Sequence, residues 1–184
     1  MERKTKKVGI ITQARYSSTR LPGKIMLLIN DRPLIDYHIE RLKKSGLPIY
    51  IASSTDRADD VIENYAREKG VNIFRGDEED VLARFFDCSK AYDLDVIIRV
   101  TSDCPLIDGD LIREAYEDYH EMDSEDIHYS CNVKHTYPHG LNFEIFSFKL
   151  LHDAHLNANT PFFREHVTPY IIQNISGCVS LRHF

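Results

Sequence analysis

Short apolar runs alternate with segments of helical periodicity along the first 120 residues of the chain. Four mostly apolar runs, each four or five residues long, predict buried strands at residues 8–11, 49–52, 71–74 and 96–100. Apolar side chains at helical spacing predict helices over residues 33–44, from residues 53–56 to Gly70, from Asp77–Asp80 onward, and around residues 111–119. Because strand and helix alternate, we expect right-handed βαβ units and a parallel sheet.

This rhythm changes beyond residue 120. Two β-like segments, 127–132 and 142–146, flank a polar and aromatic excursion at residues 135–140, which suits either a substrate loop or a dimer contact. Helices are expected at about 147–158 and 162–175, and a last short strand at 177–181. The sequence therefore predicts one domain over residues 1–184. Its fold class is α/β, a three-layer Rossmann-like fold with a mostly parallel sheet and a small irregular β excursion after residue 125.

Polar residues gather where each of the four predicted strands ends, at residues 14–24, 53–56, 75–80 and 101–108. Ligands of parallel α/β sheets bind beyond the carboxyl ends of the strands. We therefore expect these four clusters to converge into one site for an anionic ligand, although they are scattered along the sequence.

The first cluster, Ala14–Lys24, is cationic and rich in hydroxyl groups. It contains three cations and no acid, with three adjacent hydroxyl residues at 17–19. Such a loop suits a nucleotide triphosphate, because backbone N–H groups and hydroxyls wrap phosphates while Arg and Lys neutralise them. It is neither a P-loop, since Ile25 follows Gly23-Lys24, nor a G-x-G-x-x-G fingerprint. The alternative is a surface loop whose cations are merely solvated.

Asp103 follows the most apolar of the predicted strands and stands in a turn restricted by Pro105. A carboxylate beside a triphosphate is a natural Mg²⁺ ligand. The alternative is that Asp103 caps the turn.

The nine histidines show no zinc-type spacing, so we do not expect a histidine-based transition-metal site.

Composition limits which kinds of partner and which cellular compartment suit the protein. A net charge of −6 argues against nucleic acid as the main partner. No transmembrane span or signal peptide is visible, so we expect no membrane insertion. The four cysteines form no CxxC pair, which fits free thiols in a reducing cytoplasm.

Taken together, the motifs at residues 14–24, 75–84, 99–108 and 164–170 resemble those of the sugar-acid cytidylyltransferases, which make CMP-activated acid sugars such as CMP-sialic acid and CMP-Kdo. The nearest resemblance is to the SpsF-like branch, which is associated with spore coat polysaccharide. The resemblance implies a nucleotide-diphospho-sugar transferase fold. It also implies Mg²⁺-dependent transfer of CMP from CTP to an acidic sugar, with release of pyrophosphate, for surface polysaccharide or glycoconjugate synthesis. A homodimer is expected on the same ground.

The resemblance also implies roles for particular residues. Catalytic roles fall to Arg15, Lys24 and Asp103, with Asp103 binding the metal. Nucleotide contacts fall to Ala14, Arg15, Ser17, Ser18, Arg20, Lys24, Ser54, Arg75, Asp80, Thr101 and Asp103. Contacts to the acceptor sugar fall to Asn142, Glu144, Arg164 and Glu165.

Two departures from the family pattern leave alternatives open. Asn142 stands where the family commonly has Asp, and the chain ends at Phe184, before the segment that carries the family's second Asp. One alternative is therefore an inactive nucleotide-binding relative that serves as a partner subunit. Another is a nucleotidyltransferase that uses a different nucleotide or sugar.

Overall fold

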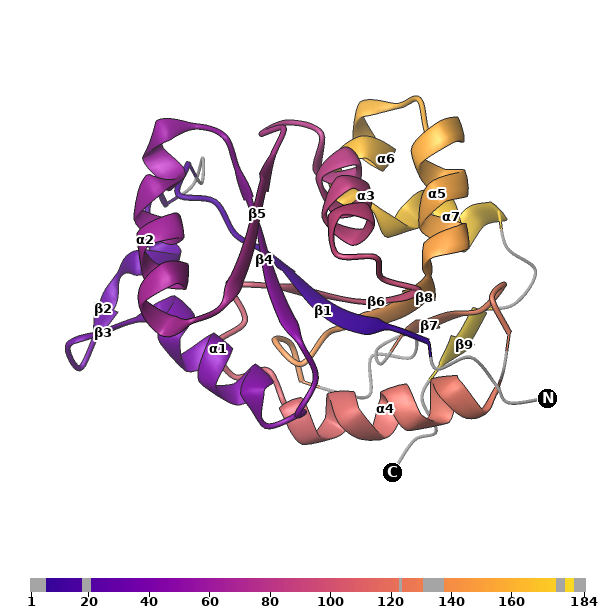
Figure 1. Ribbon diagram of the computed structural model, residues 1–184, viewed down its shortest axis with the longest axis horizontal. Helices are drawn as coiled ribbons and strands as arrows, with labels where there is room; N and C mark the ends of the chain where they lie inside the picture. Colours follow the sequence, from indigo (N-terminus) through magenta and orange to yellow (C-terminus); the bar gives the residue numbers. More distant parts are fainter. Residues whose placement is uncertain (1–5, 18–20, 123, 131–137, 175–177, 181–184) are drawn as a thin grey trace.

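A mostly parallel, twisted sheet runs through the centre of the molecule (Figure 1). The computed structural model describes residues 6–17, 21–122, 124–130, 138–174 and 178–180. In spatial order the seven strands are β5 (Asn72–Gly76), β4 (Ile49–Ser54), β1 (Val8–Gln13), β6 (Val96–Thr101), β8 (Glu144–Ser147), β7 (His128–Ser130) and β9 (Cys178–Ser180). The first four are parallel neighbours, whereas β8 runs antiparallel to both β6 and β7. The predicted α/β class with a β excursion after residue 125 is confirmed.

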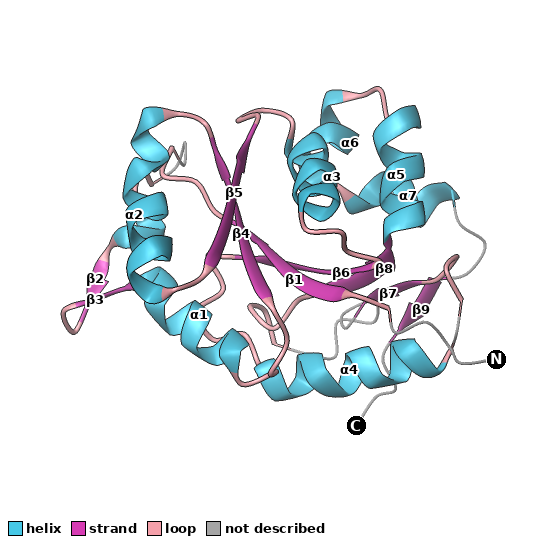
Figure 2. Cartoon of the chain, in the orientation of Figure 1, coloured by secondary structure: helices cyan, strands magenta, loops and turns pink. Residues whose placement is uncertain are grey.

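Helices cover both faces of the sheet, which gives three layers (Figure 2). One face carries α1 (Leu34–Lys43), α2 (Asp60–Lys69) and α4 (Gly109–Glu121). The other carries α3 (Val81–Ala91), α5 (Phe148–Asn157), α6 (Pro161–His166) and α7 (Thr168–Asn174). Two short 3-10 turns, Lys24–Met26 and Arg57–Asp59, and a hairpin of β2 (Leu28–Ile29) and β3 (Arg32–Pro33) complete the described elements.

Alternation along the strands divides the apolar side chains between the two layers. In β1, Ile10 packs toward α1, α2 and α4, while Ile11 packs toward α3 and α5. In β6, Ile98 packs on the same side as Ile10, and Ile97 packs on the same side as Ile11. Because both faces are covered, these strands read as continuous apolar runs rather than as alternating ones.

Two predicted helices begin or end differently from the pattern. The acidic run Asp77–Asp80 precedes helix α3 instead of opening it, and the carboxylate of Asp80 caps the helix by accepting from the N–H of Ala83. The helix expected over 162–175 is divided at Val167, which has φ 70° and ψ −64°. Pro169 is the reason, because in one continuous helix it lacks an N–H and its ring collides with the carbonyl of Glu165.

Across the described part of the chain, we find no helix with both the length and the apolar character that crossing a membrane requires.

The start of α4 lies very close to the end of α1. A Cβ atom on Gly109 would stand 2.3 Å from the carbonyl oxygen of Arg41 and 2.8 Å from the nitrogen of Ser45. Because both neighbours are backbone atoms, the two helices must separate to admit it. We expect Gly109→Ala to lower the free energy of unfolding by about 1–3 kcal/mol, measured by urea denaturation. The exposed neighbour Asp110→Ala is the control, and an equal effect of both substitutions contradicts the prediction.

Candidate active site

A cavity of about 260 Å³ lies at the carboxyl ends of β1 and β6, bounded by the start of α3 and the end of α6. Four cations line its described walls, Arg15, Lys24, Arg84 and Arg99, against two acids, Asp103 and Glu165. The excess of positive charge suits a polyanionic ligand. The predicted convergence of residues 14–24 and 101–108 is therefore present in the structure.

The loop that follows β1 is closed on itself. The N–H of Gly23 donates to the carbonyl of Tyr16 at 2.7 Å, and Gly23 has φ 70°. A side chain there would strike the Tyr16 ring at 2.8 Å, so the position requires glycine for both space and conformation. Ser18 and Arg20, two of the predicted nucleotide contacts, lie outside the described residues. Ser17 is described, and its hydroxyl donates to the carboxylate of Glu78.

Lys24 and Asp103 form an ion pair in the wall of the cavity, with 2.5 Å between Nζ and Oδ2. Burial alone would raise the pKa of Asp103, but the hydrogen bond and charge of Lys24 hold it below its ordinary value. The carboxylate is therefore ionised at neutral pH. The structure brings these two predicted catalytic residues together although they lie far apart in the sequence.

Asp59 is a fully buried carboxylate that holds the loop after β1 against the end of β4. Its oxygens accept hydrogen bonds from the N–H of Tyr16 at 2.6 Å, from the N–H and hydroxyl of Ser54 at 2.9 and 2.5 Å, and from the hydroxyl of Ser53 at 3.1 Å. The sequence analysis did not identify Asp59, because nothing in the local pattern separates it from the exposed acids Asp56 and Asp60. Ser54, a predicted nucleotide contact, is itself buried, and both its N–H and its hydroxyl donate to Asp59.

His38 is a fully buried residue of α1 that joins β1 to the turn containing Asp103. Its Nδ1 lies 2.8 Å from the carbonyl oxygen of Cys104, and its Nε2 lies 3.0 Å from Oγ1 of Thr12. A carbonyl only accepts, so Nδ1 carries the proton and the hydroxyl of Thr12 donates to Nε2. Burial lowers the pKa of His38, which favours the neutral ring.

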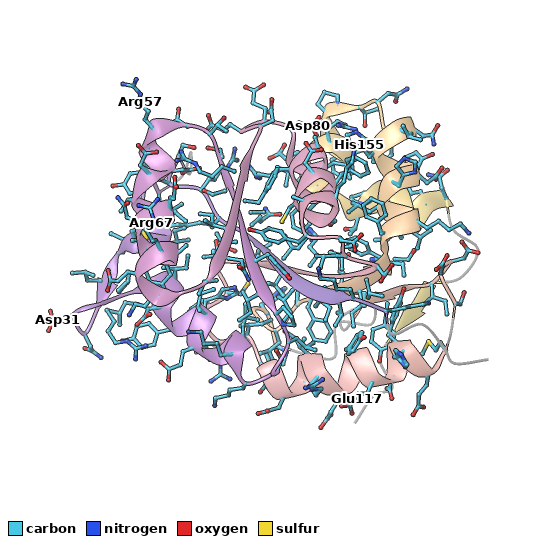
Figure 3. All side chains as sticks on the ribbon, viewed as in Figure 1. Asp31, Arg57, Arg67, Asp80, Glu117 and His155 are labelled. Carbon is cyan, nitrogen blue, oxygen red and sulfur yellow. The ribbon has the colours of Figure 1, made fainter. Side chains whose placement is uncertain are left out.

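A second pocket, of about 450 Å³, adjoins the first and shares Arg15 and Glu165 with it. Asp80 and Arg164 form an ion pair in its wall, with Arg164 Nε 2.9 Å from Oδ2 of Asp80. Arg164 also donates to the carbonyl of His155 at 2.9 Å, and Figure 3 shows Asp80 and His155 close together where α3 and α5 meet α6. In this structure Arg164 therefore connects α6 to α3 and α5.

A third pocket, of about 490 Å³, lies between β6, β8 and the α6–α7 junction. Arg99, Thr101 and His166 line both this pocket and the first. The predicted acceptor residues Asn142 and Glu144 line the third pocket alone. Two adjoining cavities that share lining residues, one strongly cationic and one mixed, suit two substrates that react with each other.

Glu144 is held in place by three partners. Arg99 Nη1 lies 2.6 Å from Oε2, the hydroxyl of Thr168 donates to the same oxygen at 3.1 Å, and His128 Nε2 lies 3.0 Å from Oε1. Burial alone would raise the pKa of Glu144, but His128, Arg99 and Thr168 together lower it to about 2. Glu144 thus orients Arg99 in the structure.

Three predicted nucleotide contacts among the described residues line none of these pockets, namely Ser17, Ser54 and Arg75. Arg75 is directed away from them. It extends from the edge strand β5, where its guanidinium binds Asp60 and Glu63 at 2.7 and 2.6 Å.

The first pocket also has lining residues that the sequence analysis did not predict, among them Gln13, Arg84, Arg99 and His166. For Arg99 a signal was present, because a cation inside the apolar strand Val96–Val100 is unusual unless it has a partner.

Comparison with known proteins gives a consistent result. The sequence profile of a family described as cytidylyltransferase matches residues 9–183. An uncharacterized protein of Methanocaldococcus jannaschii is 42% identical over 169 residues, which cover 91% of this chain and 67% of that protein. The spore coat polysaccharide biosynthesis protein SpsF of Bacillus subtilis is 34% identical over 168 residues, which cover 88% of this chain and 68% of SpsF. The chain thus spans about two thirds of the length of these relatives.

Among solved structures, a cytidylyltransferase from Leptospira borgpetersenii serovar Hardjo-bovis is similar over nearly the whole chain. The TM-score is 0.90 at 34% sequence identity, and the match covers 97% of this chain and 76% of that one.

The buried carboxylate of Asp59 leads to a stability prediction. Asp59→Asn replaces an acceptor by an NH₂ group that faces N–H and O–H donors. We expect the free energy of unfolding to fall by about 1–3 kcal/mol in urea denaturation, because at least one buried donor loses its partner. Asp56→Asn is the matched control, since Asp56 is an exposed cap and Asn caps equally well. A loss no larger than that of Asp56→Asn contradicts the assigned role.

Glu144 leads to a pH prediction. Its carboxylate has an ordinary pKa of 4.5 and a folded pKa of about 2, so its contribution to stability is complete above pH 4.5 and is lost as the pH falls toward 2. We expect the stability advantage of wild type over Glu144→Gln to shrink over that window, by up to about 3 kcal/mol, in urea denaturation at several pH values. Glu117→Gln, at an exposed position of α4, is the control. An advantage that stays constant between pH 6 and 3 contradicts the prediction.

Proposed function

The chain belongs to the cytidylyltransferase family, and on this premise we propose that it transfers a cytidylyl group from CTP to a sugar and releases pyrophosphate. The single observation that carries the proposal is the cationic cavity at the carboxyl ends of β1 and β6, with the Lys24–Asp103 ion pair in its wall. Four cations facing two acids favour a ligand with several negative charges, as a triphosphate has.

In this proposal the triphosphate binds the loop after β1. Arg15 and Lys24 neutralise phosphate oxygens, while Ala14 contributes the wall next to β1. The loop is held ready for this by the Asp59–Tyr16 hydrogen bond, which fixes its first residues before any ligand arrives. A preformed site lowers the ordering cost of binding.

Mg²⁺ is the metal that we propose for this reaction. Among the described residues no cluster of three or more His, Cys, Asp or Glu side chains is arranged to hold an ion without help. Mg²⁺ commonly binds through one or two carboxylates together with substrate phosphates, and the ionised, partly exposed Asp103 fits that mode. Bound there, Mg²⁺ would supply positive charge to the phosphate oxygens.

We place the acceptor in the third pocket, which shares Arg99, Thr101 and His166 with the triphosphate cavity. Arg99 is the arginine of that pocket; its Nη1 pairs with Glu144, and its Nε makes no hydrogen bond within the described residues. A carboxylated sugar would pair with the part of the guanidinium that Glu144 leaves unoccupied. Asn142 and Thr168 add amide and hydroxyl groups to the same wall, which suit the hydroxyls of a sugar.

The chain's own residues act by positioning and by charge. A hydroxyl of the acceptor attacks the α-phosphorus, a new P–O bond forms, and the P–O bond to the leaving pyrophosphate breaks. The cations of the cavity stabilise the charge that develops on that leaving group. Holding both substrates in adjoining pockets turns a bimolecular reaction into an effectively unimolecular one.

Nucleotide binding tests the proposal directly. We expect Mg²⁺-dependent binding of CTP in preference to ATP, GTP and UTP by isothermal titration calorimetry. Lys24→Ala is expected to weaken CTP binding about 10- to 100-fold, the value of one charge-assisted contact. Asp103→Ala is expected to remove most of the Mg²⁺ dependence. Lys43→Ala, on the exposed side of α1, is the control.

Absence of nucleotide binding by wild type contradicts the proposal. Selective binding of another nucleotide favours a nucleotidyltransferase with a different donor. Where CTP binds, release of pyrophosphate is measured with a panel of carboxylated and neutral sugars. Binding without release on any sugar of the panel favours the alternative of an inactive nucleotide-binding relative.

A further inference from the structure

Most arginines in the described part of the chain form an ion pair with a carboxylate, and the few that do not are informative. The paired arginines are Arg32, Arg41, Arg67, Arg75, Arg99, Arg113 and Arg164. Within the described part of the chain, Arg15, Arg57 and Arg84 have no such partner. Arg57 is exposed and extends into solvent at the start of α2, where water solvates its charge (Figure 3). Arg15 and Arg84 are different, because both line the cationic cavity.

Arg84 is almost completely buried, with 1% of its surface exposed. Its Nη1 donates to the carbonyl oxygens of Asp77 at 2.9 Å and Glu78 at 3.4 Å, and its Nε has no hydrogen-bond partner among the residues that the structure describes. Arg15 Nη1 donates to the same Glu78 oxygen at 3.4 Å. Two guanidinium groups therefore converge on one carbonyl.

This arrangement is electrostatically unfavourable without an anion. Burial and the neighbouring charge of Arg15 both lower the pKa of Arg84, while Asp59, Asp77 and Glu78 offset the effect only in part. An unpaired buried charge costs free energy, and a second cation beside it adds to that cost. By contrast, the other two cations of the cavity already have carboxylate partners, Lys24 at Asp103 and Arg99 at Glu144.

We propose that Arg84 and Arg15 together form the main phosphate-binding pair of the cavity, with Arg84 as a buried ligand contact on the α3 side. A phosphate group carries the charge that the pair lacks, and its oxygens accept the parallel N–H groups of a guanidinium. The inference rests on the proposed function, since the phosphate is that of the nucleotide. It adds that, without Mg²⁺, anion affinity depends more on this pair than on Lys24, because Lys24 is then paired with Asp103.

The probe is inorganic tripolyphosphate, which carries the phosphates without base or sugar. Binding is measured by calorimetry in Mg²⁺-free buffer for wild type, Arg84→Gln, Lys24→Ala and the control Arg57→Gln. We expect Arg84→Gln to weaken tripolyphosphate and CTP binding about 10- to 100-fold, with a smaller loss for Lys24→Ala and none for Arg57→Gln. The rise in midpoint temperature that tripolyphosphate gives wild type is expected to disappear in Arg84→Gln, which a purely structural role does not predict.

Two results separate the possible failures. If wild type binds tripolyphosphate and Arg84→Gln binds it within twofold of wild type, the inference is wrong while the proposed function stands. If wild type binds neither tripolyphosphate in this buffer nor CTP in buffer that contains Mg²⁺, the proposed function itself fails.

If Arg84→Gln does not fold, Arg15→Gln is tested in its place. The Arg15 side chain makes a single described hydrogen bond, to Glu78, so we expect this variant to fold. Unchanged tripolyphosphate binding in that variant equally overturns the inference.

Discussion

The in-register pairing of β1 with β6 is the constraint on which the rest of the site depends. Gln13 is opposite Thr101, so the loops that follow the two strands leave the sheet at the same level. That register lets Lys24 reach Asp103 and gives one cavity rather than two separate loops. Because the side-chain period of a strand is two, a slip of one residue would exchange the two buried faces and separate the loops.

Buried polar groups then fix the loops that the sheet has brought together. Asp59 holds the loop after β1, His38 holds the turn after β6, and Glu144 holds Arg99 between two pockets. Asp59, His38 and Glu144 all have hydrogen-bond partners for their buried polar atoms among the described residues, so they fix the loops without the cost of an unsatisfied buried group. Arg84 differs, because its buried Nε has no hydrogen-bond partner among the described residues. Arg84 lines the cavity, so a bound ligand could supply that partner.

The junction of α6 and α7 links the two proposed substrate pockets. Val167 adopts a positive φ that a β-branched residue rarely takes, and it is fully buried. On one side of it His166 lines both pockets, and on the other the hydroxyl of Thr168 donates to Glu144. The break in the helix thus serves the pocket wall, in keeping with the tendency of backbone strain to gather at functional sites.

The sequence by itself determined the layers, the alternation of the four parallel strands with helices up to α4, and the edge of the sheet at which the polar loops meet. It did so because apolar periodicity reports which residues are buried, and because parallel strands end at one edge. Only the tertiary structure decided which partner each side chain takes. Arg164 pairs with Asp80, 84 positions away, while Arg75 turns to Asp60 and Glu63 outside the pockets. Such pairings depend on distances between residues remote in the chain, which no local pattern encodes.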